Sequence, residues 1–208
     1  MAQTIQAQDV TLNDLRTKFK LQYIETDQFF REWQDNIPEV SESEKQSLDR
    51  IKSNYLNLIE YPPMLENTVK MVVLSPLLDL AGFYQRPFRI STEKQLEILS
   101  EDEGTIVKGK IDVLVLQEQF WILVIEAKKA QFSLETGIPQ ALAYMMDNPN
   151  PEQPTFGLVT NGSNFIFIKL TKQDTPLYSV SDEFTLRRKN DLYSVLSVLK
   201  RLGNDISQ

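Results

Sequence analysis

The charged side chains near residues 112 and 126–128 have types and a spacing suited to metal-assisted chemistry. Asp112 lies in an apolar stretch that reads as a strand, and Glu126-Ala127-Lys128 ends a second apolar stretch after a turn at 117–119. Alternation separates two sets of residues in the first stretch, with Lys108, Lys110 and Asp112 on one face and Val107, Ile111, Val113 and Val115 on the other. Charges at the end of an apolar strand are costly to bury, so they reach solvent or pair with something. Two carboxylates and a lysine in this arrangement suggest a metal site.

The composition restricts which metal such a site could hold. The 208 residues include no cysteine and no histidine, which excludes a thiolate site, a typical zinc site and a Ser-His-Asp triad. Oxygen ligands remain, and they favour hard cations such as Mg²⁺, Mn²⁺ or Ca²⁺. Because Mg²⁺ keeps several waters, Asp112, Glu126 and the backbone carbonyl of Ala127 would be sufficient protein ligands. Lys128 could then orient an attacking water or neutralise charge that develops on a phosphate.

Other polar residues could belong to the same site. Gln140 and Tyr144 are four residues apart in a predicted helix and therefore share a face, where they could touch the metal site or a nucleic-acid backbone. A plainer alternative has Tyr144 in the core and Gln140 on the surface. Lys110 is a candidate substrate contact, and Glu66 has the position of a favourable acid in the first turn of a helix. A plain alternative also exists for the charged set itself, as a partly solvated ion-pair cluster at the edge of the sheet.

The first part of the chain reads as helical. Thr11 with Asp14 and Ser41 with Glu44 are capping boxes that predict two helices, and a short helix is expected around 29–33. We therefore expect residues 1–61 to form a helical N-terminal extension that packs on a main domain of residues 62–208.

The main domain has alternating helix and strand signals. A helix is expected at 64–80, with a kink or restart at Pro76, and Gly82 as its C-terminal stop. Asn161-Gly162 is a hairpin signal. The expected strands are 85–91, 95–99, 106–116, 120–128, 156–160, 164–170 and an edge strand at 178–180, with an acidic loop at 101–104 and further helices at 134–147 and 189–202. This order predicts an α/β fold with a mixed central sheet.

Charge and hydropathy limit the partners. The net charge of −7 weighs against a dedicated nucleic-acid binder, although a carboxylate-built metal site is itself acidic. No apolar run approaches the length of a membrane span and the N-terminus does not resemble a leader peptide. A soluble, cytoplasmic protein with no membrane association is the expectation.

Taken together, these residues resemble the PD-(D/E)xK nuclease superfamily, through Asp112 followed by Glu126-Ala127-Lys128. More narrowly, they look like the N-terminal nuclease domain of type I restriction enzyme R subunits. The segment LENTVKMVVLSPLLDLAGF, residues 65–83, is similar to the opening helix of that group, and QALAY, residues 140–144, matches its Q-x-x-x-Y motif. The resemblance covers about residues 62–170 and implies a restriction-endonuclease-like αβββαβ core.

The resemblance also implies roles. Asp112 and Glu126 become metal ligands for Mg²⁺ or Mn²⁺, Lys128 the catalytic lysine, Glu66 a helper carboxylate, and Gln140 and Tyr144 groups that position substrate or water. The implied activity is metal-dependent hydrolysis of DNA phosphodiester bonds.

Two features of the sequence differ from those of the nuclease group that it resembles. Ile111 stands where the name of the superfamily has proline, and no G-x-x-x-x-G-K-[ST] loop occurs, which excludes ATP-driven translocation by this polypeptide. A separate motor or methylase subunit, or a homodimer, would then be needed to hold DNA. The alternative is a catalytically silent nuclease-fold module that binds DNA or assembles a restriction or defence complex.

Overall fold

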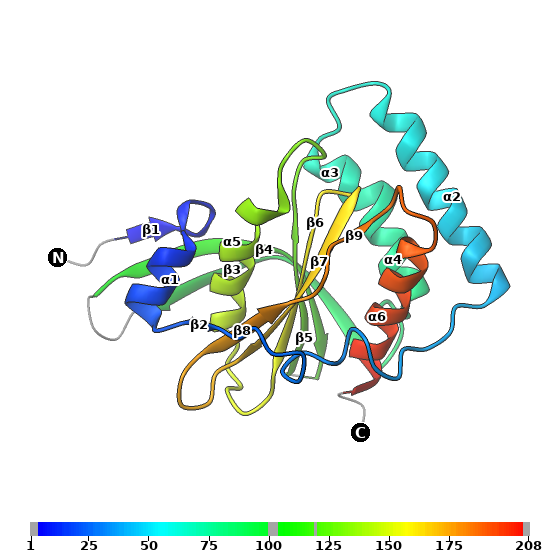
Figure 1. Ribbon diagram of the computed structural model, residues 1–208. Coiled ribbons are helices and arrows are strands. Elements are labelled where there is room, and N and C mark those ends of the chain that lie inside the picture. Colours follow the sequence, from blue (N-terminus) through cyan, green and yellow to red (C-terminus); the bar gives the residue numbers. More distant parts are fainter. Residues whose placement is uncertain (1–3, 100–103, 119, 206–208) are drawn as a thin grey trace.

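A mixed β-sheet runs through the protein and carries helices on both faces (Figure 1). The computed structural model describes residues 4–99, 104–118 and 120–205, so the predicted acidic loop at 101–104 lies mostly outside them. The main strand order is β1 (Thr4–Gln6), β4 (Ile106–Gln117), β5 (Phe120–Ala127), β6 (Thr155–Thr160), β7 (Asn164–Thr171), β8 (Leu177–Val180) and β2 (Gln22–Tyr23). Off this path, β3 (Phe88–Leu99) pairs with β4, and β9 (Phe184–Thr185) pairs with β7. The predicted α/β class with a mixed central sheet is confirmed.

Parallel and antiparallel pairings both occur. The β5–β6 pair is parallel and is connected through α5 (Ile138–Met146), which gives a βαβ unit. β4–β5 and β6–β7 are antiparallel hairpin neighbours. The predicted edge strand at 178–180 is wrong in one respect, because β8 pairs with β7 on one side and with β2 on the other.

The helices form a layer on each face of the sheet. On one face lie α2 (Glu42–Ile59), α3 (Glu66–Val69), α4 (Ser75–Leu80) and α6 (Asp191–Asp205), seen to the right of the sheet in Figure 1. On the other face lie α5 and α1 (Leu12–Phe19). In the described ranges, no helix has both the length and the apolar character needed to cross a bilayer.

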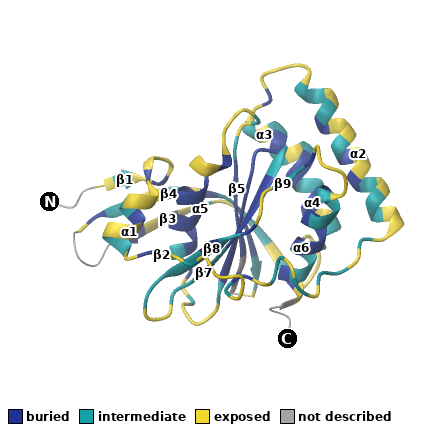
Figure 2. Cartoon of the chain, in the orientation of Figure 1, coloured by how far each residue is buried: buried dark blue, intermediate teal, exposed yellow. Residues whose placement is uncertain are grey.

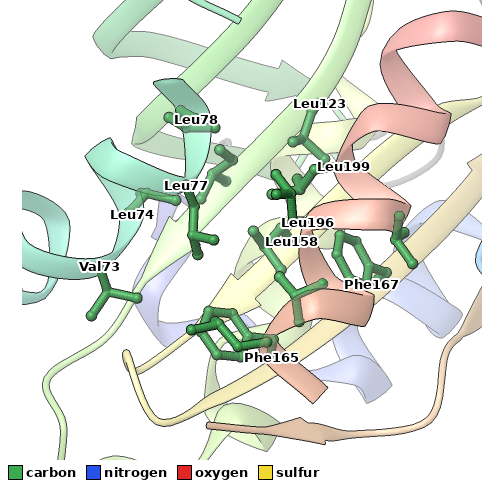
Figure 3. Packing of buried hydrophobic residues seen from close by; sticks show 14 of the residues in the cluster. Val73, Leu74, Leu77, Leu78, Leu123, Leu158, Phe165, Phe167, Leu196 and Leu199 are labelled. Carbon is green, nitrogen blue, oxygen red and sulfur yellow. The ribbon is translucent and has the colours of Figure 1, made fainter. Parts of the chain in front are cut away.

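Each layer encloses its own core. Leu77 of α4 and Leu196 of α6 meet Phe165 and Phe167 of β7 in the first core (Figure 3). The second core packs α5 against the opposite face of the same strands. Because both of its faces are covered, every residue of β6 is buried, and burial is concentrated in the centre of the sheet (Figure 2).

The N-terminal segment contains the two predicted capped helices. In α1 and α2 the capping hydroxyl accepts a hydrogen bond from the backbone N–H three residues later, and the carboxylate of that later residue accepts one from the backbone N–H of the cap residue, which confirms both capping boxes. The short helix expected around 29–33 is wrong, because the backbone there forms turns whose aromatic side chains pack on the first core. This segment also supplies β1 and β2 to the sheet. The domain boundary at residue 61 stays a prediction.

The regular alternation of side chains between the two faces of the sheet is broken at Asp112 in the paired strands β3 and β4, referred to below as the β3–β4 ribbon. The two strands expected at 85–91 and 95–99 are one strand, whose pairing runs from Lys94↔Ile111 to Thr92↔Val113. Ile111 belongs to the second core and Val113 to the first, so the expectation that these residues share a face is wrong. Between the two pairs, Glu93 has a positive φ of 56°, a conformation that breaks regular alternation. Asp112 therefore sits where the ribbon turns over.

The predicted helix at 64–80 is continuous through Pro76. α3 runs into a π-helical turn, Lys70–Leu74, and then into α4, with Pro76 in the first turn of α4. The predicted kink or restart after Ser75 takes the form of this π-helical turn, because Pro76 cannot donate the backbone hydrogen bond that would continue a regular helix. Gly82, with φ of 84°, follows the helix as predicted. The helix expected at 134–147 is instead a 3-10 turn, Leu134–Thr136, followed by α5.

Candidate active site

A cleft of about 750 Å³ gathers the candidate residues from four separate segments. It lies where β4 and β5 approach the start of α3 and the buried face of α5. Its lining includes all the side chains singled out in the sequence, namely Glu66, Lys110, Asp112, Glu126, Lys128, Gln140 and Tyr144. The structure thus brings together residues that are up to 78 positions apart, from Glu66 to Tyr144.

Asp112 links the two central strands of the site. Its Oδ2 accepts a hydrogen bond from the backbone N–H of Ala127 at 2.8 Å, and its Oδ1 lies 2.5 Å from Nζ of Lys70. Burial raises the pKa of Asp112, although the hydrogen bonds from Lys70 and Ala127 act in the opposite direction. Each oxygen of this carboxylate therefore already has a defined partner.

Glu126 is almost completely enclosed, with 3% of its surface exposed. Its Oε1 forms an ion pair with Nζ of Lys128 at 2.9 Å, while its Oε2 is buried without a hydrogen-bond partner in the described structure. Burial, and next the charge of Asp112, raise the pKa of Glu126 to about 8. An unpartnered carboxylate oxygen at this depth is costly, and a proton or a cation would compensate it.

Lys128 stands just beyond the end of β5, where it is held by a polar chain. Its backbone N–H donates to the carbonyl of Thr160 at 2.7 Å, and its Nζ donates to Oε1 of Gln140 at 2.5 Å. Nε2 of Gln140 in turn donates to the hydroxyl of Tyr144 at 2.6 Å. Burial, followed by the charge of Glu126, raises the pKa of Tyr144 to about 12, so this hydroxyl stays protonated.

The hydrogen bonds that join Lys128, Gln140 and Tyr144 decide between the two interpretations of the α5 face. Tyr144 is buried among core residues, as the plainer alternative held, but its hydroxyl belongs to the site. The expectation that Gln140 is a surface residue is wrong, since only 8% of it is exposed. The other alternative is a partly solvated cluster of ion pairs at the edge of the sheet. Ion pairs are present, but they surround the buried Glu126 and do not lie at a solvated edge.

Lys110 lies on the outer wall of the cleft. Its side chain is half exposed and pairs with Glu93 at 3.3 Å, and its backbone hydrogen-bonds the hydroxyl of Tyr144. The preceding residue, Gly109, allows this approach, because a Cβ there would lie 2.8 Å from Cε1 of Tyr144 and 2.5 Å from Cβ of Ala7. Sequence reasoning missed Gly109, for which an isolated glycine inside a strand is the available signal.

Lys70 is the second residue that sequence reasoning missed. It bridges the site, with Nζ 2.5 Å from Asp112 and 2.8 Å from Oε1 of Glu66. Its spacing of four residues from Glu66 predicts an ion pair within the helix. Its contact with Asp112, 42 residues away, could not be read from spacing.

The residues present fit a hard divalent cation that is completed by water and substrate oxygens. In the described part of the chain, no three acidic side chains are grouped so as to hold a metal by themselves. Mg²⁺ needs fewer, and Asp112, Glu126 and the carbonyl of Ala127 would be enough together with non-protein oxygens. The unpartnered Oε2 of Glu126 is the observation that a cation there would explain.

Fold and site together define an α/β protein with carboxylates and a lysine at the end of a mixed sheet. Residues 9–175 match the family model described as the type I restriction enzyme R protein N terminus, and the chain belongs to this family. The resemblance to R subunits is thereby confirmed. A search of curated proteins found no match.

Solved structures include similar folds. The chain in the cryoEM structure of a DrdV–DNA complex is 13% identical, with a TM-score of 0.50, over 74% of this chain and 14% of that one. A fragment of a putative HsdR subunit of a type I restriction enzyme from Vibrio vulnificus YJ016 is 19% identical, with a TM-score of 0.41, over 68% of this chain and 26% of that one. The protein thus spans only a minor part of both solved chains, and the first of them shows a shared fold.

Proposed function

We propose that the protein is a metal-dependent DNA endonuclease of the PD-(D/E)xK type that hydrolyses phosphodiester bonds with Mg²⁺ or Mn²⁺. The observation that carries the proposal is the buried Oε2 of Glu126, which lacks a partner while Asp112 and Lys128 lie beside it. Among the described residues, Oε2 of Glu32, whose other oxygen pairs with Lys169, is also buried without a partner, so the proposal rests on the coincidence of such an oxygen with Asp112 and Lys128 in one cleft. Membership of the R protein N-terminus family supports the same reading.

In this proposal Asp112, Glu126 and the carbonyl of Ala127 hold the metal ion. When bound, the ion would supply Lewis-acid stabilisation of charge on the phosphate and lower the pKa of a water. Glu66 is proposed as a helper carboxylate at the mouth of the cleft.

The lysine and the polar chain behind it would orient the reactants. Lys128, held by Gln140, would direct its N–H bonds at the attacking water or at a phosphate oxygen. Tyr144 would fix the orientation of Gln140, and the half-exposed Lys110 would contact a phosphate at the rim.

DNA binding would require help from another surface. With a net charge of −7, the chain has little long-range attraction for a polyanion. A separate motor or methylase subunit, or a second copy of this chain, would supply the basic surface. The chain of a solved DNA complex, DrdV, shares the fold, which supports DNA as the partner.

A second candidate is a catalytically silent module that binds DNA or assembles a restriction or defence complex. The acidic charge favours it, as does the ion pair by which Lys70 already neutralises Asp112. DNA binding that weakens steeply as salt rises would separate a DNA-binding module from a purely protein-binding one.

The deciding experiment is cleavage of supercoiled and linear DNA by the purified protein with Mg²⁺ or Mn²⁺, and with EDTA. Metal-dependent nicking should fall at least about 100-fold in Lys128→Ala. Lys129→Ala is the matched control, because it removes the adjacent, exposed lysine and should retain activity. Absence of cleavage on both DNA forms would favour the silent module, and equal activity of Lys128→Ala would refute the assignment of the site.

A further inference from the structure

Lys70 occupies the coordinating side of Asp112. Because Oδ2 of Asp112 is engaged by the N–H of Ala127, Oδ1 is the oxygen best placed to face a cation, and Nζ of Lys70 lies 2.5 Å from it. The same ammonium contacts Oε1 of Glu66 at 2.8 Å. Two of the four carboxylates that line the cleft, Asp112 and Glu66, are therefore contacted by one lysine, while Oε2 of Glu126 is left without a partner.

Two local irregularities of the backbone produce this contact. Lys70 opens the π-helical turn between α3 and α4, and π-turns shift the direction in which side chains leave a helix and are frequent at functional sites. Asp112 lies where the β3–β4 ribbon changes faces.

The side chain of Lys70 also borders a second cavity, into which it could turn. A second cavity of about 500 Å³ opens beside Asp112 and is lined by Lys70 together with Asn67, Met71, Tyr84 and Thr92. Only 22% of the Lys70 side chain is exposed where it stands, but its long aliphatic stem can rotate into this space.

We propose that Lys70 is a built-in competitor of the divalent metal ion. It holds Asp112 and Glu66 in the metal-free protein, and it must withdraw into the second cavity before a metal can bind Oδ1 of Asp112. The inference rests on the proposed function, because it presumes that Asp112 is a metal ligand. Lys70 is thus a positioning residue that sets how readily the site is loaded.

Titration calorimetry with Mn²⁺ at one fixed pH tests this competition. Lys70→Met and the more polar Lys70→Gln should bind Mn²⁺ about 10- to 100-fold more tightly than the wild type, which is the range expected on removing one charge-assisted hydrogen bond. Lys108→Met is the matched control: Lys108 lines the same cleft but pairs with Glu97 at 3.2 Å, so its loss changes net charge without freeing Asp112. It should shift the affinity less than about threefold.

A second readout follows the lysine itself in the wild-type protein. Acetylation by a small amine-reactive ester, quantified by mass spectrometry, should increase several-fold at Lys70 when Mn²⁺ is added and stay constant at Lys108. This measurement needs no variant to fold.

The outcomes separate this inference from the proposed function. If Mn²⁺ binds the wild type and is lost in Asp112→Asn, while both Lys70 variants bind it no more tightly and Lys70 acetylation does not change, the competition is refuted and the metal site stands. If neither the wild type nor the Lys70 variants bind Mn²⁺, both ideas are refuted. Tighter binding in the Lys70 variants, with Lys108→Met unchanged, supports the competition.

Discussion

Nζ of Lys128 donates to Oε1 of Gln140 at 2.5 Å, and this bond joins the end of β5 to the buried face of α5. Gln140 in turn donates a hydrogen bond to the hydroxyl of Tyr144, and this hydroxyl is also hydrogen-bonded to the backbone of Lys110 on β4. Three elements of the site are thus linked through one buried amide. Since Lys128 also pairs with Glu126, its ammonium has little freedom to turn away from the cleft.

Loss of the Gln140 amide should lower the rate of DNA cleavage more than it lowers the stability of the fold. Gln140→Leu keeps the volume but removes both hydrogen bonds, so Lys128 would be poorly oriented and the cleavage rate should fall about 10- to 100-fold, as for other supporting residues of metal sites. Gln95→Leu, an exposed change at the rim of the same cleft, is the control. Initial rates of cleavage of supercoiled DNA would measure the effect. A fully active Gln140→Leu variant would contradict the role of Gln140 in orienting Lys128.

Removal of the buried hydroxyl should destabilise the protein. Tyr144→Phe leaves Nε2 of Gln140 buried without its acceptor, at a cost of about 1–3 kcal/mol in the free energy of unfolding. Tyr193→Phe, which removes a surface hydrogen bond to Asp49, should cost about 0.5 kcal/mol or less. Urea denaturation measures both. Equal effects would mean that the hydroxyl of Tyr144 is not held in the buried chain.

The stability of the metal-free protein should depend on pH through Glu126. Its pKa is about 8 in the folded protein against an ordinary value of 4.5, so the folded state holds a proton that the unfolded state releases. This contribution is fully present below pH 4.5 and is lost as pH rises through about 8. Relative to Glu126→Gln, the wild type should therefore lose free energy of unfolding across that window.

Urea titrations at several pH values in EDTA would measure this difference, which we expect to be on the order of a few kcal/mol. The Gln variant cancels the titration of the groups that do not interact with Glu126. Parallel pH profiles for the two proteins would show that Glu126 is already ionised at neutral pH.

Gly109 should not tolerate a side chain. A Cβ would lie 2.5 Å from Cβ of Ala7 and 2.8 Å from Cε1 of Tyr144, so Gly109→Ala forces the 3-10 turn Ala7–Asp9 or α5 to move and should cost about 1–3 kcal/mol. Ala7→Gly combined with Gly109→Ala removes one of the two contacts and should recover part of the loss. Unchanged stability of the single variant would contradict the close approach.

Local patterns in the sequence determined much of the fold. The two capping boxes placed α1 and α2, alternating and continuous apolar runs placed β4 to β7, and the spacing of Gln140 and Tyr144 placed both on one face of α5. These features depend on neighbours within a few residues, which is why the sequence alone predicts them. The same reasoning assembled the seven candidate side chains that line the cleft.

Tertiary structure decided what lies between those elements. The reversal of the β3–β4 ribbon at Asp112, the burial of Gln140 and the contact of Lys70 with Asp112 across 42 residues all depend on how separate elements cross. Sequence periodicity gives the face on which a residue lies only within a regular element, and it does not give which distant segment covers that face. The same lysine that pairs with Glu66 along one helix could therefore be identified as the partner of Asp112 only in the folded chain.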